Sequence, residues 1–89
     1  MTKQVLRLYI VEKTPSGIQA VATVNKMIEE GLNELCSLEI IDVTKNPEKA
    51  ESDLISAVPA LIQTQPPKKR VVGNLGNMDQ VKIALGLEL

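Results

Sequence analysis

The chain has 89 residues, with ten basic and eleven acidic side chains, so its formal net charge is −1 and no strong field directs it to nucleic acid or membrane. It contains no histidine, one cysteine and a single aromatic residue, Tyr9. These counts exclude an intramolecular disulfide and a Cys/His zinc site, remove the commonest general base, and argue against a surface that stacks nucleobases. We therefore expect a protein that is not an enzyme and that has no catalytic residues, cofactor or metal.

The length is that of one domain, residues 1–89. No apolar run approaches the roughly 18 residues of a membrane-spanning helix. The N-terminal residues lead into a strand-like segment that contains Arg7, which is not the pattern of a secretory signal. A cytoplasmic protein without a membrane partner is the resulting expectation.

The first quarter of the chain predicts a strand followed by a helix. Residues 4–11 are rich in β-branched and apolar side chains interrupted by Arg7, which is typical of a strand covered on both faces. Thr14 as N-cap and Pro15 at the first helical position predict a helix over residues 15–30. The residues that recur at helical spacing, and so predict its apolar face, are Ile18, Val21, Ala22, Val24, Ile28 and Leu32.

A second strand and a second helix follow. Residues 35–43 predict the strand, whose apolar content is Leu38, Ile40, Ile41 and Val43. Asn46, followed by a proline and an acidic residue, predicts the start of the helix. The helix should end before Val58, because the residue that precedes a proline is pushed out of the α region. Its expected apolar stripe is Ala50, Leu54, Ile55 and Ala57.

The last third predicts two strands and a helix. Pro59 cannot lie inside a central strand but can stand at the entry of one, here residues 60–64. A short polar connection separates this strand from residues 70–72, so the two should form an antiparallel hairpin. Asn77 followed by Gln80 predicts the start of the final helix, and Gly86 its end. The expected apolar face of this helix is Met78, Val81, Ala84 and Leu85.

The order of elements, β-α-β-α-β-β-α, predicts an α/β protein with a mixed four-stranded sheet. The first two strands should be joined by a parallel crossover, and the last two should be antiparallel. This is the layout of the thioredoxin-like fold, in which the strand after the second helix is entered through a cis-proline. We therefore expect the Val58–Pro59 bond to be cis.

Redox chemistry of the thioredoxin type is not expected. Redox members of the fold carry Cys-x-x-Cys in the loop before the first helix, where the helix N-terminus lowers a thiol pKa. Residues 12–17 contain no cysteine, and Cys36 lies at the start of the second strand, where we expect a small core residue. Asp42, within an apolar strand, is expected to cap a loop or pair with a lysine.

Five segments together resemble a known family. They are residues 8–11 (LYIV), 14–15 (TP), 41–47 (IDVTKNP), 57–61 (AVPAL) and 66–75, which contains PP followed by RVVGNL. Their order and near-gapless spacing over almost the whole chain resemble the KaiB family, the thioredoxin-like partner proteins of the KaiC ATPase in circadian clock systems.

The resemblance implies a non-enzymatic interaction module that binds a KaiC-type ATPase in a clock or clock-like regulatory system. KaiA-like or histidine-kinase components are further implied partners, and self-association as a dimer or tetramer is implied as well. The family is also known for a ground state in which the C-terminal half is rearranged, and this is the alternative fold. The alternative function is a thioredoxin-like sensor or adaptor module in a stress or signalling response, independent of a clock.

Two sets of residues are candidates for partner binding. The first accompanies the second helix and comprises Lys45, Glu48, Glu51 and Asp53; the second is the basic cluster Lys68, Lys69 and Arg70. Solvated helix and hairpin surfaces are the alternative reading of both. The residues proposed to act in a structural switch are Pro59, Gly73, Asn74, Gly76 and Asn77, since glycine and asparagine tolerate changes in φ.

The sequence also departs from the family pattern. The family's Gly-Asp-Leu-Ser-Asp is Gly-Asn-Leu-Gly-Asn here, so two carboxylates are lost. Glu39 stands where the strand usually carries a lysine. These changes suggest a divergent member with altered partner electrostatics.

Overall fold

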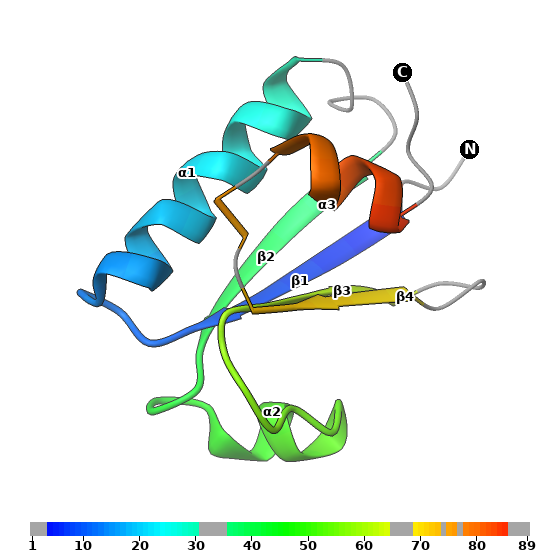
Figure 1. Cartoon of the computed structure of the whole chain (residues 1–89). Helices are drawn as coiled ribbons and strands as arrows, with labels where there is room; N and C mark the ends of the chain where they lie inside the picture. The colour runs from blue at the N-terminus through cyan, green and yellow to red at the C-terminus, as the bar shows by residue number, and fades with distance from the viewer. Residues whose placement is uncertain (1–3, 31–35, 65–68, 74, 77, 86–89) are drawn as a thin grey trace.

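The expected order of elements is confirmed by a computed structural model, which describes residues 4–30, 36–64, 69–73, 75–76 and 78–85 (Figure 1). Along the chain these are β1 (Gln4–Ile10), α1 (Pro15–Glu29), β2 (Cys36–Asp42), α2 (Pro47–Ser52), β3 (Ala60–Gln63), β4 (Lys69–Val72) and α3 (Met78–Leu85). Most strand and helix boundaries lie within one or two residues of the expected ones, and α2 is the exception.

The strands form one mixed sheet in the order β2-β1-β3-β4. β1 runs parallel to β2 and antiparallel to β3, and β3 and β4 form the expected antiparallel hairpin. The Val58–Pro59 peptide bond at the entry to β3 is cis, as predicted. The thioredoxin-like fold class is therefore confirmed.

Helices cover both faces of the sheet, with α1 and α3 on one side and α2 on the other (Figure 1). Successive strand residues point to opposite faces, so β1 supplies both cores. The buried core under α1 and α3 contains Leu6, Leu8, Ile10, Ala20, Val24, Met27, Ile28, Cys36, Leu61, Leu75 and Val81. The smaller core on the α2 face contains Tyr9, Ile41, Ala50, Ala60 and Ile62.

The buried stripe of α1 differs from the predicted one. Ile18 is 62% exposed and Ala22 is exposed, whereas Ala20 and Met27 are buried. The stripe begins at Gly17, because this residue lets the first turn of the helix lie directly against the end of β1. The predicted face is therefore confirmed in part, since Val24 and Ile28 are buried and Val21 packs against the core.

Two further apolar residues are exposed. On β2, Ile40 is 46% exposed. On α3, Val81 is buried as expected, but Ala84 is exposed. The side chains of Met78 and Leu85 lie outside the described part of the structure. Leu32 and Gly86 lie outside it entirely.

Helix α2 is shorter than the sequence predicted, because it ends at Ser52 instead of continuing to residue 57. Leu54 has a φ of 56°, which is left-handed, and its side chain is 77% exposed. The Ile55 N–H donates to the Ala50 carbonyl at 2.8 Å, and the Leu54 N–H donates to the Glu51 carbonyl at 3.1 Å. These two bonds form the Schellman motif, which stops a helix at a left-handed residue. Of the predicted stripe, only Ala50 and Ile55 contact the core.

No helix in the described ranges is both long enough and apolar enough to cross a membrane.

Candidate functional site

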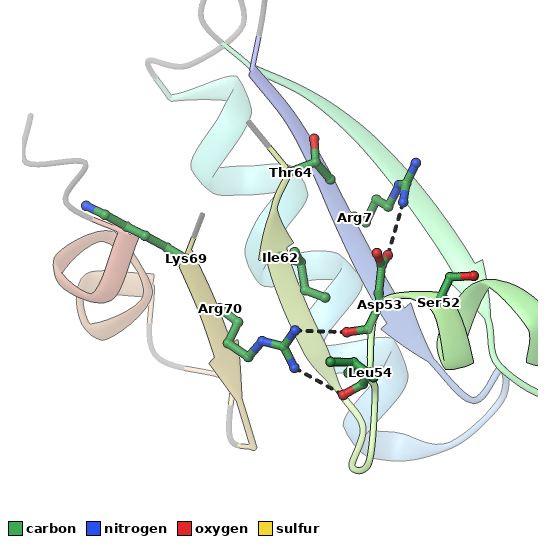
Figure 2. Close-up of a pocket in the computed structure, with 8 residues that line it drawn as sticks. All are labelled: Arg7, Ser52, Asp53, Leu54, Ile62, Thr64, Lys69 and Arg70. Carbon is green, nitrogen blue, oxygen red and sulfur yellow. Dashed lines mark hydrogen bonds and ion pairs between the residues drawn. The ribbon is translucent and has the colours of Figure 1, made fainter. Parts of the chain in front are cut away.

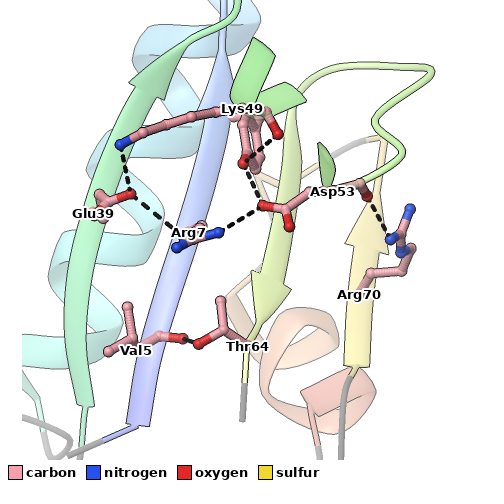
Figure 3. Close-up of polar contacts among 8 residues, drawn as sticks. Val5, Arg7, Glu39, Lys49, Asp53, Thr64 and Arg70 are labelled. Atoms are coloured by element: carbon pink, nitrogen blue, oxygen red, sulfur yellow. Dashed lines mark hydrogen bonds and ion pairs between the residues drawn. The ribbon is translucent and has the colours of Figure 1, made fainter. Parts of the chain in front are cut away.

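A cluster of polar side chains joins α2 to the sheet. We call Arg7, Tyr9, Glu39, Lys49 and Asp53 the polar cluster, and Figure 3 labels all of them except Tyr9. The Tyr9 hydroxyl, on a fully buried ring, donates to the Asp53 carboxylate and lies 3.1 Å from the Lys49 carbonyl oxygen. Arg7 Nη1 is 3.1 Å from Asp53 Oδ2, and Arg7 Nε is 3.4 Å from Glu39 Oε1. Lys49 Nζ also lies 3.5 Å from Glu39 Oε1, so the cluster connects β1, β2 and α2.

Two members of the polar cluster, Asp53 and Tyr9, have pKa values shifted away from neutral pH. Burial acts to raise the pKa of Asp53, but hydrogen bonds from Tyr9 and Arg7 outweigh it, and the pKa lies below the ordinary value of 3.8. Burial and the hydrogen bond to Asp53 raise the pKa of Tyr9 to about 12. A general acid or base needs a pKa near the working pH, whereas the pKa values of both Asp53 and Tyr9 are moved further from neutral pH. The arrangement therefore serves to attach α2 to the sheet.

Arg70 extends these contacts to the hairpin. From β4, its Nη1 lies 3.1 Å from the Leu54 carbonyl oxygen and its Nη2 lies 2.8 Å from the Asp53 carbonyl oxygen. A longer α2 would use these carbonyls for its own backbone hydrogen bonds. The contacts of Arg70 and the Schellman motif are therefore both consistent with a helix that ends at Ser52. The structure thus brings together one residue from each of the two candidate sets, Asp53 and Arg70.

The other candidate partner-binding residues that the structure describes are Lys45, Glu48, Glu51 and Lys69. Glu48 and Glu51 are exposed on α2, and Lys45 is exposed beside Glu12, with 3.0 Å between Nζ and Oε2. Lys69 is partly buried on β4, and Lys68 lies outside the described residues. Asp53 was expected on the solvated face of α2, but it caps the helix C-terminus and its carboxylate is turned toward the sheet.

Two of the candidate switch residues, Pro59 and Gly73, share a backbone hydrogen bond. The Gly73 N–H donates to the Pro59 carbonyl oxygen at 3.0 Å, just beyond the end of β4. Gly73 has a φ of 102°, a conformation that side-chain-bearing residues rarely adopt. Gly76 is exposed, and Asn74 and Asn77 lie outside the described residues.

Asp42 has the loop-capping role expected from the sequence. Its buried carboxylate accepts hydrogen bonds from the Thr44 N–H at 2.8 Å, the Thr44 hydroxyl at 2.6 Å and the Glu12 N–H at 3.2 Å. These bonds, led by the Thr44 hydroxyl, lower the pKa of Asp42. Asp42 thereby ties the loop after β1 to the loop after β2.

Cys36 is buried at the start of β2, and burial raises the pKa of its thiol. A raised pKa keeps the thiol protonated and unreactive. Within the described residues, no group of three or more histidine, cysteine or acidic side chains is arranged to hold a metal ion.

Most of the polar cluster was not singled out as a site from the sequence. Its signal was the interruption of the apolar strand by Arg7, which the structure places directly opposite Glu39 in the β1–β2 register. A charged side chain on a covered face needs a partner of opposite charge. The partner Asp53 is distant in sequence, and only the fold places it opposite Arg7.

Comparison with known proteins decides the family. A family model described as the KaiB domain matches residues 7–87. The chain belongs to the KaiB family. A KaiB relative from Thermostichus vulcanus, called circadian clock oscillator protein KaiB, is 40% identical over 84 residues, which cover 93% of this chain and 78% of the relative. The protein of the same name from Cyanothece sp. is 38% identical over 86 residues, covering 96% and 80% of the two chains.

Solved structures agree with the fold of this KaiB-family chain. The N-terminal domain of Synechococcus elongatus SasA has a TM-score of 0.75 at 22% identity, covering 99% of this chain and 88% of that domain. Chloroplastic thioredoxin z has a TM-score of 0.77 at 17% identity, covering 94% and 76%. At these identities the similarity concerns the fold alone, and it supports the thioredoxin-like assignment.

Proposed function

We propose that the protein is a non-enzymatic interaction module that binds a KaiC-type ATPase in a circadian clock or clock-like regulatory system in the cytoplasm. The observation that carries the proposal is the KaiB-domain match over residues 7–87, together with clock oscillator relatives at 38–40% identity. KaiA-like and histidine-kinase components are further proposed partners. Self-association as a dimer or tetramer is proposed as well.

We place the partner-binding surface on the outer side of α2. The exposed candidates there are Glu48 and Glu51 on the helix and Lys45 just before it. Asp53 and Arg70 act differently, because their contacts fix the end of the helix and the following turn. Removing them would disturb the fold as well as any contact with a partner, whereas the charges of Glu48 and Glu51 can meet a partner directly without a role in the fold.

A double charge reversal, Glu48→Lys with Glu51→Lys, is expected to weaken binding to the KaiC-type ATPase of the same genome by about tenfold or more. The proposal is that the two acidic side chains face basic groups of the partner, so that lysines there would place like charges across the interface. Both side chains are exposed, so the fold should remain intact. Size-exclusion chromatography with ATP or ADP, followed by calorimetric titration, measures the effect.

The matched control is Glu29→Lys with Glu30→Lys at the exposed end of α1, on the opposite face of the sheet. This variant makes the same change of net charge and should bind like the unmodified protein. Absence of any complex between the unmodified protein and the ATPase, with either nucleotide, would contradict the proposed function. Equal binding by both double variants would contradict the surface.

We also propose that the chain has the family's second fold within reach and that the Pro59 and Gly73–Asn77 region takes part in the change. Two folds of one sequence must lie within a few kcal/mol of one another for both to be populated. The support here is local, since the Gly73–Pro59 hydrogen bond joins the hairpin to the start of β3 and depends on a glycine-specific φ.

Replacing Gly73 with alanine is expected to destabilise the thioredoxin-like state by about 1–2 kcal/mol, because its φ of 102° strains any residue with a Cβ atom. The space around the site is open, so the loss comes from the backbone and not from a clash. Denaturant unfolding measures the loss, and Gly73→Asn should lose less because asparagine tolerates positive φ better.

Backbone NMR of both proteins tests the second fold. Gly73→Ala should increase the population of a minor set of peaks relative to the unmodified protein. A single set of peaks in both proteins, with no minor state in exchange experiments, would argue for one fold.

A further inference from the structure

The α2 face of the sheet contains an open hollow of about 420 Å³ (Figure 2). Its lining comes from four places in the chain: Arg7 on β1, Ser52 to Leu54 at the end of α2, Ile62 and Thr64 at β3, and Lys69 and Arg70 on β4. Ile62 is 6% exposed and forms an apolar base, and Leu54 stands at the rim with most of its surface in solvent. Pockets of a few hundred Å³ are large enough for a small organic ligand.

The charge of this hollow is positive. In the polar cluster, Arg7 and Lys49 are matched by Asp53 and Glu39, each within 3.5 Å of an opposite charge. Arg70 differs, since its two hydrogen bonds go to neutral backbone carbonyls. Its hydrogen bonds therefore form no ion pair, although the Asp53 carboxylate is near enough to interact with its charge. The lining as a whole has three cationic side chains, Arg7, Lys69 and Arg70, against the one carboxylate of Asp53, and further N–H donors remain on the two terminal nitrogens of Arg70.

The hollow therefore combines a guanidinium held in place with an apolar base. Figure 2 shows Arg70 and Arg7 on either side of Asp53 and Ile62, with Thr64 near Arg7 and with the Lys69 side chain extending away. Because Arg70 is fixed by the turn after α2, little side-chain entropy remains to be lost when it binds an anion. Guanidinium groups bind carboxylate and phosphate oxygens especially well.

We propose that this hollow binds a small organic anion, a carboxylate or a phosphate ester, whose charged group contacts Arg70 and whose aliphatic part lies over Ile62 and Leu54. This site does not depend on the proposed partner. It would make the end of α2 responsive to a metabolite, because the ligand would rest on the turn that fixes the helix.

The test is an NMR titration of the isolated ¹⁵N-labelled chain at constant ionic strength. The probes are glutarate for a carboxylate source, glycerol phosphate for a phosphate source, and glycerol as the neutral comparison. Saturable shifts at the amides of Leu54, Ile62, Thr64 and Arg70 with either anion support the site, and the stronger probe identifies the source. Absence of saturable shifts with both anions, or equal shifts with glycerol, overturns it.

Two variants at one position decide whether charge at the hollow is responsible. Leu54→Lys should tighten binding several-fold, and Leu54→Glu should weaken it several-fold. Both replace an exposed side chain at the same left-handed residue, so their backbone costs are matched and Arg70 is retained. Equal affinity of the two variants would contradict the proposal.

Removal of the Arg70 guanidinium is expected to change the affinity for the anion more than either Leu54 variant does. Arg70→Gln should weaken binding about tenfold or more, the usual size of a lost charge-assisted hydrogen bond. The control is Lys26→Gln on α1, which removes the same charge from an exposed site on the opposite face and should leave binding unchanged. Equal losses in Arg70→Gln and Lys26→Gln would show only a general charge effect and would overturn the site.

Discussion

Replacing Asp53 with alanine is expected to lower the free energy of unfolding by about 2–3 kcal/mol, since it leaves a buried tyrosine hydroxyl and a partly buried guanidinium without their shared acceptor. The Asp53 side chain is 21% exposed, and its carboxylate receives hydrogen bonds from both Tyr9 and Arg7. The estimate is below that for a fully buried ion pair, because Arg7 retains Glu39 and part of its hydration. Urea unfolding followed by circular dichroism measures the change.

The control for this prediction is Glu51→Ala, two residues earlier and exposed on α2, which should change stability by no more than about 0.5 kcal/mol. Equal effects of the two substitutions would show that the polar cluster adds nothing to stability.

The stability difference between the unmodified protein and Asp53→Ala is expected to depend on pH. The folded-state pKa of Asp53 is depressed, so its stabilising contribution is complete above the unfolded value near 3.8 and is lost as the pH falls through the folded value. The stability difference between the unmodified protein and Asp53→Ala should therefore be constant around neutral pH and shrink below about pH 4. Asp42 also has a lowered pKa, but it is present in both proteins and cancels.

The topology could be predicted because each element carried its own local signal. Thr14 and Pro15 mark the start of α1, and the Thr14 side chain does accept a hydrogen bond from the Gly17 N–H at 3.1 Å. Pro59 marks the entry to β3, and the short connection after β3 implies a hairpin. These signals depend on neighbouring residues only, so a sequence is enough to read them.

The end of α2 could not be predicted, because it depends on residues that are remote in sequence. A Schellman motif usually has glycine at the left-handed position, and here that position is Leu54, which instead matched the apolar spacing of a continuing helix. The contacts that favour the early end come from Tyr9, Arg7 and Arg70, all remote in sequence. Long-range hydrogen bonds overrode the local pattern.

The short α2 explains how the candidate surface is presented. Ala50 is the only residue of the helix that is buried, so apolar packing alone holds it weakly. The polar cluster supplies the remaining attachment through Lys49 on the helix and Asp53 at its C-cap. Because the attachment lies on the inner side, Glu48 and Glu51 remain exposed on the outer side. Their charges are therefore available to a partner without loss of the fold.

Replacing Gly17 with alanine is expected to destabilise the protein by about 1–3 kcal/mol, the range typical of overpacking, although helix propensity alone predicts a gain of about 1 kcal/mol. A Cβ atom at Gly17 would lie 2.6 Å from the Val11 carbonyl oxygen and 2.8 Å from Thr14 Oγ1. Contacts below 3.0 Å essentially never occur for real Cβ atoms, so the backbone must shift. Thermal and urea unfolding measure the net effect.

The shift would damage the start of α1 as a unit. Thr14 Oγ1 accepts from the Gly17 N–H at 3.1 Å and donates to the Val11 carbonyl at 2.7 Å, so the added methyl group presses on both ends of this connection. Ser16→Ala is the matched control, since the neighbouring side chain is exposed and should change stability by no more than about 0.5 kcal/mol. A more stable Gly17→Ala protein would mean that propensity outweighs the close approach of α1 to β1, and the position of the buried stripe would then need another cause.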